Sequence, residues 1–154
     1  MEIRESLKRL QIAKNLISNL KVLEVLKKYG TPLVIGSVAQ EVVCKRDIDI
    51  VIETTNLRDT SKKILYEFIE NENFKKIQYG DFIKFPRNNR PKGFIINIFV
   101  DDVEGNPWEF EIWILSDIKN YKMELKKLNH RSQEEKNNII IGKFRSSKNL
   151  NKVV

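Results

Sequence analysis

A Gly-Ser pair followed by an Asp-x-Asp motif constrains the fold of this chain more than any other feature of its sequence. The apolar residues 33–35 predict a buried strand, and Gly36 and Ser37 then turn the chain into a short helix over residues 38–43. Residues 47–52 alternate in polarity, which is typical of a half-buried strand. The segment therefore predicts a strand, a turn, a helix and a second strand in succession.

The two acids of the motif, Asp47 and Asp49, fall on one face of the second strand, and the intervening isoleucines fall on the other. Adjacent carboxylates repel each other, which costs stability on an apolar strand unless a cation lies between them. A divalent metal ion is the simplest such cation. The alternative is a solvated cluster in which the acids pair with Lys45 and Arg46.

The rest of the chain alternates helical and strand patterns. The predicted helices cover residues 4–29, 59–71, 116–128 and 132–143. The later predicted strands cover residues 74–79, 82–85, 94–100 and 108–115. Residues 86–93 form a basic loop that proline and glycine keep out of regular structure, and the last two strands are expected to pair antiparallel.

The length of 154 residues suits one domain, which we expect to cover residues 1–145, with a flexible tail over residues 146–154. Cys44 is the single cysteine, so no intrachain disulfide and no cysteine-based zinc site can form. The free thiol indicates a reducing compartment, and the chain shows neither a signal-peptide pattern nor a stretch of membrane-spanning length. We therefore expect a cytoplasmic protein.

The chain is basic, with 28 Lys and Arg against 21 Asp and Glu and a formal net charge of +7. Such an excess favours polyanionic partners, for example nucleoside triphosphates or RNA. Lysine-rich chains also carry solvated lysines that bind nothing, so charge alone does not decide the partner.

A third acidic group is predicted on the strand over residues 108–115. Alternation places Glu109, Glu111 and Trp113 together on one face of this strand. If the strand lies beside residues 48–52, one of the two glutamates can converge with Asp47 and Asp49 on the same ion. Carboxylate oxygens suit Mg²⁺, which takes its other ligands from water and phosphate oxygens.

These motifs resemble those of the polymerase-beta-like nucleotidyltransferase superfamily, whose pattern is an apolar residue with Gly-Ser, a helix, Asp-x-Asp on a strand, and a later apolar-acidic-apolar strand. The matching elements, in order, are Ile35-Gly36-Ser37, Asp47-Ile48-Asp49 and Phe110-Glu111-Ile112. The resemblance covers roughly residues 33–115 and is greatest to small stand-alone members. It implies an α/β (α+β) nucleotidyltransferase fold, with a mixed sheet of about five strands, helices on one face and a helical C-terminal tail.

The resemblance also implies the activity. In the family, an acceptor hydroxyl attacks the α-phosphorus of a nucleoside triphosphate such as ATP, and pyrophosphate leaves. Asp47, Asp49 and Glu111 would be the catalytic acids and would hold two Mg²⁺ ions, for which Mn²⁺ could substitute. Gly36 and Ser37 would bind the phosphates.

Two basic residues complete the site that the resemblance implies. Arg46, directly before the aspartates, is expected to contact the nucleotide. A Lys or Arg from residues 87–92 of the basic loop, with Lys92 as the candidate, is expected to stabilise the pyrophosphate. The acceptor stays open between a small molecule, an RNA end and a protein side chain.

Two departures from the family pattern leave a second function open. The third acid is Glu where many members have Asp, and the chain ends soon after it, so a second copy of the chain or a helical partner protein could hold the acceptor. The alternative function is a noncatalytic nucleotide-binding regulator or antitoxin-like module on the same scaffold. An RNA-binding domain ranks last, because the chain lacks the Gly-aromatic motifs of single-strand readers.

Overall fold

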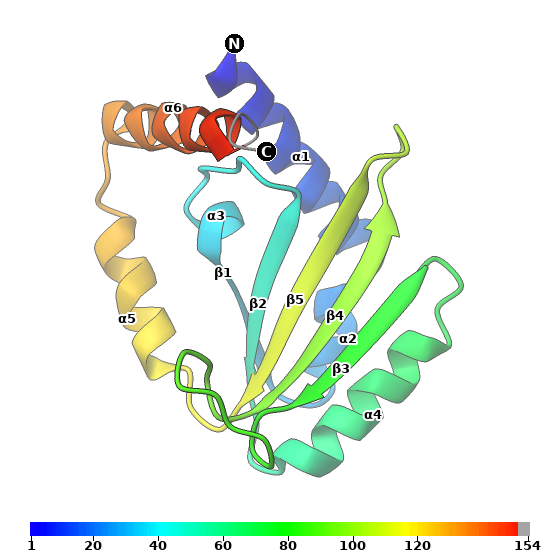
Figure 1. Ribbon diagram of the computed structural model, residues 1–154. Helices are drawn as coiled ribbons and strands as arrows, with labels where there is room; N and C mark the ends of the chain where they lie inside the picture. Colours follow the sequence, from blue (N-terminus) through cyan, green and yellow to red (C-terminus); the bar gives the residue numbers. More distant parts are fainter. Residues whose placement is uncertain (151–154) are drawn as a thin grey trace.

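The sheet is built around a parallel pair of strands, β2 (Asp47–Glu53) and β5 (Pro107–Leu115). A computed structural model describes residues 1–150 of the chain. On the outer side of β2, β1 (Thr31–Ile35) pairs antiparallel, and on the outer side of β5, β4 (Phe94–Asp101) pairs antiparallel. β3 (Lys76–Asp81) completes a five-stranded mixed sheet of order β1-β2-β5-β4-β3 (Figure 1). The predicted sheet is confirmed.

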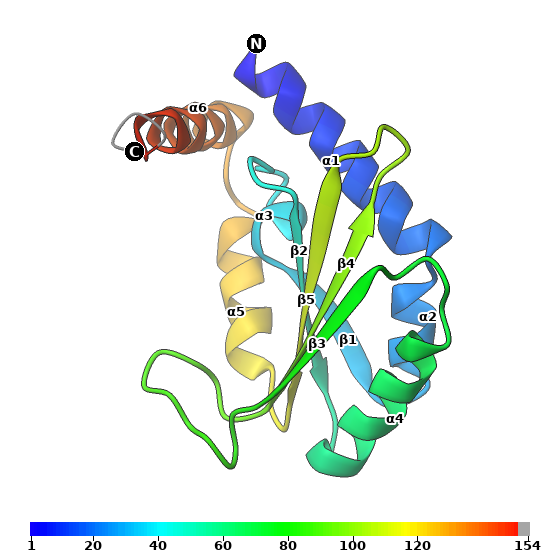
Figure 2. The ribbon, with the colours of Figure 1, turned by 45° about the vertical axis from the view of Figure 1, so that its right-hand side comes forward.

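One face of this sheet carries the main hydrophobic core. The helices α1 (Glu2–Asn19), α2 (Val22–Lys27) and α4 (Leu57–Ile69) cover that face (Figure 2). The central strands supply its fully buried residues through their alternation: Ile48, Ile50, Ile52, Phe110, Ile112 and Ile114. Burying each such side chain contributes about 1.5–3 kcal/mol, so the core fixes which face of β2 and β5 is left for polar residues.

The opposite face carries a smaller apolar cluster. Val51, Trp113 and Ile118 are buried there, and Tyr121 of α5 (Lys119–Leu128) packs against them. α5 lies on this side of the sheet, away from the other long helices (Figure 2). The helical C-terminal part that we expected is therefore present, and it covers the face to which the acids point.

The first helical segment is divided in two, which corrects the prediction of one helix over residues 4–29. α1 ends at Asn19, and Lys21 adopts a left-handed backbone with φ of 55° before α2 begins. The break redirects the chain so that Val22 and Leu26 are completely buried. No glycine or proline marks the break in the sequence, which is why the periodic pattern did not predict it.

Three other local predictions differ from the structure. The helix after the Gly-Ser turn, α3 (Gly36–Ala39), is shorter than residues 38–43. α4 covers Leu57–Ile69 instead of residues 59–71, because the Asn56 side chain caps it by accepting a hydrogen bond from the Asp59 amide. Residues 82–85 form a turn instead of a strand, because Asp81 Oδ1 accepts hydrogen bonds from the next backbone amides.

The last helix, α6 (Gln133–Leu150), is longer than the predicted residues 132–143. It extends into the segment expected to be a flexible tail from residue 146; residues 151–154 lie outside the described part. α6 crosses the end of the sheet where β2 and β5 begin and lies beside α1 (Figures 1 and 2). Within residues 1–150, no helix combines the length and apolar character needed to cross a membrane.

Candidate functional site

The predicted acids lie on the two central strands and at matching levels. Because β2 and β5 run parallel, Asp47 is paired in register with Glu109, and Asp49 with Glu111. The residues between them are buried in the main core, so all four carboxylates belong to the opposite face. The expected adjacency of residues 108–115 to the Asp-x-Asp strand is therefore confirmed.

Asp49 is surrounded by the negative charges of the other three acids of this cluster. The pKa of its carboxyl is raised to about 6, first by burial and then by the negative charges of Asp47, Glu111 and Glu109. Lys143 acts in the other direction and lowers it. A raised pKa here means that the ionised carboxylate has too little positive charge nearby, which is the condition that a bound cation relieves.

The Gly-Ser turn contacts the same carboxylate. Gly36 has a φ of +66°, and a Cβ atom at this position would lie 2.4 Å from Asp49 Oδ2. Only glycine combines that backbone conformation with so close an approach. The next residue, Ser37, has a buried Oγ with no hydrogen-bond partner within the described residues. A buried hydroxyl without a partner is costly, and it indicates a group that completes the site.

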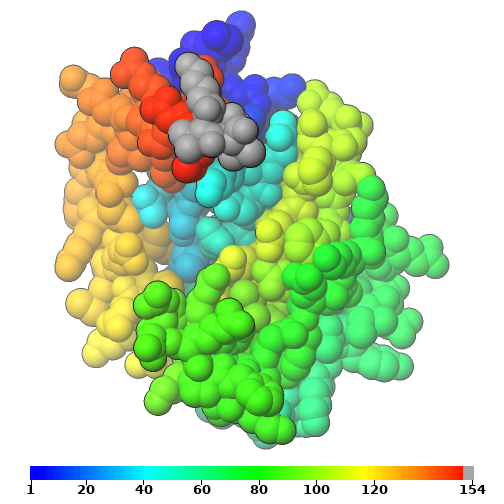
Figure 3. Space-filling model, viewed as in Figure 1, coloured from blue at the N-terminus to red at the C-terminus, as the bar shows by residue number. Residues whose placement is uncertain are grey.

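Asp47, Asp49 and Ser37 line a pocket of about 540 Å³, which we call the acid pocket. Cys44 and Lys45 line it from the segment before β2. The α6 helix forms the opposite wall, through Ile139, Gly142, Lys143, Ser146, Ser147 and Leu150. Figure 3 shows α6, in orange and red, lying over the cyan segment of the chain that includes α3. Asp47 and Asp49 thus lie between the sheet and α6, whereas Glu109 and Glu111 do not line this pocket.

The glutamates of β5 have partners of their own. Glu109 Oε1 accepts a hydrogen bond of 2.6 Å from Asn97 Nδ2. Glu111 Oε1 accepts one of 2.9 Å from Trp113 Nε1, and the Arg90 guanidinium lies 3.7 Å from the same oxygen. Each glutamate thus has a second oxygen outside these contacts, and each is in register with one aspartate. The negative charge of Glu111 raises the pKa of Asp49 more than that of Glu109 does, which favours Glu111 as the third acid.

The two predicted basic residues do not line the acid pocket. Arg46 lines a neighbouring groove, and Lys92 is exposed and lines none of the described pockets. The cation of the basic loop that reaches the acids is Arg90, through its contact with Glu111.

The α6 wall was not predicted. The Lys143 Nζ on this wall lies 3.5 Å from the Val42 carbonyl oxygen, and its charge lowers the pKa of Asp49. A signal was present in the sequence, because small residues and Lys143 recur at helical spacing on one side of the segment: Gly142, Lys143, Ser146 and Ser147. A Cβ at Gly142 would meet nothing within 4 Å, so the small residues leave this side of α6 open to the pocket.

The residues of the acid pocket fit a divalent cation in charge and in ligand type. Asp47 and Asp49 provide hard oxygen ligands, and the Ser37 hydroxyl is an additional oxygen without a partner. Within residues 1–150, however, no three acidic, histidine or cysteine side chains form a ready-made metal site. Glu111 does not line the pocket, and only its Oε1 is hydrogen-bonded to Trp113.

Comparison with known proteins supports the fold. No protein-family model matches the chain, and no curated protein matches it in sequence. Among solved structures, a GTP pyrophosphokinase family protein from Streptococcus pneumoniae matches with a TM-score of 0.52 and 15% identity, over 99% of this chain and 90% of that one.

Two RNA-modifying enzymes give similar scores over a smaller part of their length. The Cid1 poly(U) polymerase bound to MgGTP has a TM-score of 0.52 and 14% identity, over 84% of this chain and 40% of that one. A cytoplasmic RNA terminal U-transferase has a TM-score of 0.50 and 12% identity, over 80% and 37%. The chain thus spans about two fifths of the length of these two enzymes. Together with the sheet order and the position of the acids, these likenesses show that the chain has the nucleotidyltransferase fold.

Proposed function

We propose that the protein is a Mg²⁺-dependent nucleotidyltransferase, which transfers a nucleoside monophosphate from a nucleoside triphosphate to an acceptor hydroxyl. The observation that carries this proposal is the acid pocket itself. It combines a poorly neutralised carboxylate, Asp49, with a buried Ser37 hydroxyl that has no partner. One group lacks a cation and the other lacks a hydrogen-bonding partner, and a nucleotide with its Mg²⁺ supplies both.

Asp47 and Asp49 would hold the metal, as one ion or two, and Glu111 would join them. Bound Mg²⁺ supplies the positive charge that a triphosphate and its leaving pyrophosphate require. Structures of the similar Cid1 poly(U) polymerase hold Mg²⁺ with 3′-dATP, ATP or GTP, which supports this cofactor and this substrate class.

The chain's own residues have separate tasks in the transfer. Ser37 binds the phosphates from the close turn at Gly36, and Lys143 on the facing wall stabilises the pyrophosphate. The acceptor oxygen forms a bond to the α-phosphorus, and the bond from that phosphorus to the bridging oxygen of pyrophosphate breaks. The proton of the acceptor hydroxyl goes to Glu111 Oε2, the oxygen not bonded to Trp113.

A noncatalytic nucleotide-binding regulator is the second candidate. The observation that favours it is the state of Glu111, which is already hydrogen-bonded to Trp113 and lies close to Arg90. A chain with only Asp47 and Asp49 free could bind a nucleotide with Mg²⁺ without taking the acceptor's proton.

Turnover separates the two candidates. The protein is incubated with Mg²⁺, with each nucleoside triphosphate in turn labelled at the α-phosphate, and with a lysate that supplies acceptors. The release of pyrophosphate and the transfer of the label are both measured. We expect transfer by the wild-type chain and none by Asp49→Asn. Asp59→Asn is the matched control, because Asp59 is an exposed acid on α4 that pairs with Lys63.

Calorimetric titration with Mg²⁺ and nucleotide measures nucleotide binding independently of turnover. Binding without transfer would identify a regulator. Unchanged Mg²⁺-dependent binding by Asp49→Asn would contradict both candidates.

A further inference from the structure

A second cavity of about 350 Å³ adjoins the acid pocket, and its lining is strongly basic. We call it the basic groove. Arg9 of α1, Lys45 and Arg46 before β2, and Lys148 of α6 supply four cationic side chains. The other lining residues are uncharged: Cys44, Pro107, Phe144 and Ser147. Four cations without a carboxylate among the lining residues create a positive potential that attracts anions.

The basic groove and the acid pocket are continuous. Cys44, Lys45 and Ser147 line both of them. Arg46 in the groove directly precedes Asp47 in the acid pocket. These three shared lining residues place the groove directly beside the pocket that holds Asp47 and Asp49.

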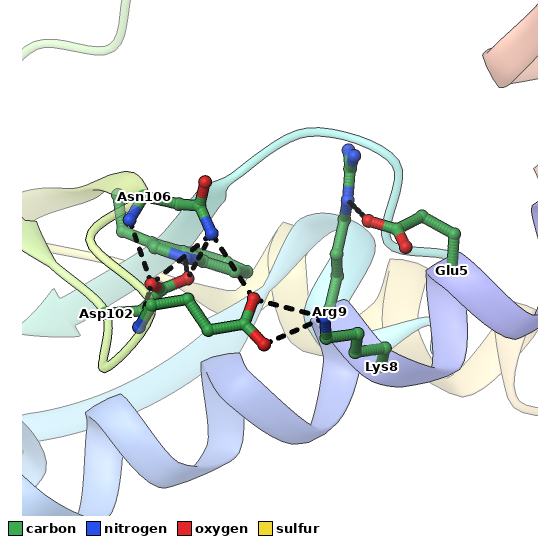
Figure 4. Close-up of polar contacts among 7 residues, drawn as sticks. Glu5, Lys8, Arg9, Asp102 and Asn106 are labelled. Atoms are coloured by element: carbon green, nitrogen blue, oxygen red, sulfur yellow. Dashed lines mark hydrogen bonds and ion pairs between the residues drawn. The ribbon is translucent and has the colours of Figure 1, made fainter.

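Arg9 is held in place for binding. Its Nε donates a 2.8 Å hydrogen bond to Glu5 Oε1, and another nitrogen donates to the Cys44 carbonyl oxygen. Figure 4 shows Arg9 and Glu5 side by side on α1. The guanidinium also lies over the Phe144 ring, 5.3 Å from its centre. These contacts fix the position of the guanidinium before any ligand arrives, so less entropy is lost on binding.

The other cations of the groove have little neutralising charge. Lys45 and Arg46 form no ion pair within residues 1–150, and Lys148 has only a distant, exposed pair with Glu2 at 3.8 Å. Glu5 offsets part of the charge of Arg9, so the free positive charge of the groove rests mainly on Lys45, Arg46 and Lys148.

We propose that the acceptor carries a phosphate group, which binds in the basic groove and places a nearby hydroxyl of the same molecule in the acid pocket. This inference rests on the proposed nucleotidyl transfer and adds the chemical class of the acceptor to it. Phosphate oxygens match arginine and lysine donors in charge and geometry. An RNA end and a small phosphorylated metabolite share this chemistry.

A charge-matched pair of variants tests the groove by binding. Arg46→Gln with Lys148→Gln removes two groove cations, and Lys62→Gln with Lys122→Gln removes two exposed lysines from α4 and α5. Fluorescence anisotropy measures affinity for a short labelled oligoribonucleotide. We expect the groove variant to bind about a hundredfold more weakly, because two charge-assisted contacts are lost, and the control to bind as the wild type does.

Salt dependence adds an independent measurement. Each lost phosphate contact lowers the slope of log affinity against log salt by about 0.7 for a single strand. We expect the groove variant to lose about 1.4 in slope and the control to lose none. Equal affinities and slopes for the groove variant and its control would overturn the proposal.

Competition with a nucleoside monophosphate distinguishes the two acceptor sources. If the monophosphate displaces the oligoribonucleotide and the groove variant weakens both ligands, the site serves small phosphorylated acceptors. If only the longer ligand is affected, an RNA end is the source. Either result supports the groove, because both depend on its cations.

Kinetics with a phosphorylated acceptor keep this inference separate from the proposed function. The groove variant should raise the KM for the acceptor and leave the KM for the nucleoside triphosphate unchanged. If the wild type transfers the nucleotide and the groove variant has an unchanged KM for the acceptor, the groove does not bind the acceptor. The proposed transferase activity would then still hold. Absence of any transfer or Mg²⁺-dependent nucleotide binding in the wild type would overturn the transferase first.

Discussion

The carboxyl group of Asp49 links stability to function at the scale of one residue. Its pKa is raised from 3.8 to about 6 by burial and by the neighbouring acids. In the unfolded chain the group loses its proton near the ordinary value, whereas in the folded chain it keeps the proton to a higher pH. The folded state therefore loses stability as the pH rises from about 3.8, the unfolded pKa, to about 6, the folded pKa. Above about pH 6 this loss of stability stays constant.

We predict that Asp49→Asn stabilises the metal-free protein at neutral pH. The gain is about 1 kcal/mol, after allowing for the part of the carboxylate that faces solvent. The difference should vanish when the pH falls below the ordinary aspartate pKa, where both side chains are neutral. Urea denaturation of both proteins across this range measures it, and saturating Mg²⁺ should stabilise the wild type alone. A pH-independent difference would contradict the assignment to Asp49.

Gly36 gives a second prediction at this scale, with Gly105 as its control. Both glycines have positive φ, +66° and +82°, but a Cβ at Gly105 would meet nothing within 4 Å. Gly105→Ala should cost only backbone strain, about 1 kcal/mol. Gly36→Ala adds the clash with Asp49 and should cost about 3 kcal/mol, together with nucleotide binding. Equal losses in denaturant titrations would show that the turn does not approach the carboxylate closely.

At the scale of elements, α6 brings a cation to the acid pocket. Lys143 lines the acid pocket and lowers the pKa of Asp49. We predict that Lys143→Met weakens nucleotide binding about tenfold, since one charge-assisted contact is lost. Lys136→Met on the same helix should have no effect on binding, because the Lys136 amino group pairs with Glu41 at 3.1 Å and lies outside the pocket. Titration calorimetry with Mg²⁺ and nucleotide compares them, and equal affinities would exclude this role for α6.

The sequence predicts some of these elements well and others poorly, for physical reasons. β2 and β5 are recognisable because alternation separates their core isoleucines from their acids. The position of α6 cannot be predicted from the sequence, because helical periodicity shows which side of a helix is apolar but not which element packs opposite it. Ile140 is buried while Lys143 faces the acid pocket, and both facts depend on where α6 packs.

The basic residues show the same limit. The prediction for Arg46 and Lys92 rests on their positions along the chain. The structure instead places Arg46 in the basic groove and Arg90 next to Glu111, and both positions depend on the tertiary packing of the groove and the loop. The acids could be predicted because strand pairing fixes backbone register. Long cationic side chains have no such register.

At the scale of the whole molecule, the two tryptophans report on opposite faces of the sheet. Trp108 is buried in the main core, and its Nε1 donates a 3.0 Å hydrogen bond to Asp102 Oδ2. Trp113 lies in the smaller cluster and donates to Glu111. A change at the acids should therefore reach Trp113 and leave Trp108 undisturbed.

Single-tryptophan variants test this separation. We predict that nucleotide with Mg²⁺ changes the fluorescence of Trp108→Phe, which retains Trp113, because Glu111 exchanges its indole hydrogen bond for the ligand. The emission of Trp113→Phe, which retains Trp108, should stay constant. Equal changes in both variants would indicate a rearrangement of the whole sheet rather than of the acid face.

The parallel pairing of β2 with β5 also determines when the protein can first act during its synthesis. β3, β4 and the β4–β5 hairpin lie between the two strands along the chain, and joining distant strands closes a long loop, which slows folding. A ribosome-bound chain that has not yet released residues 107–115 has Asp49 but no Glu111 beside it. Nascent chains therefore lack the paired acids that the proposed transfer requires until the sheet is complete.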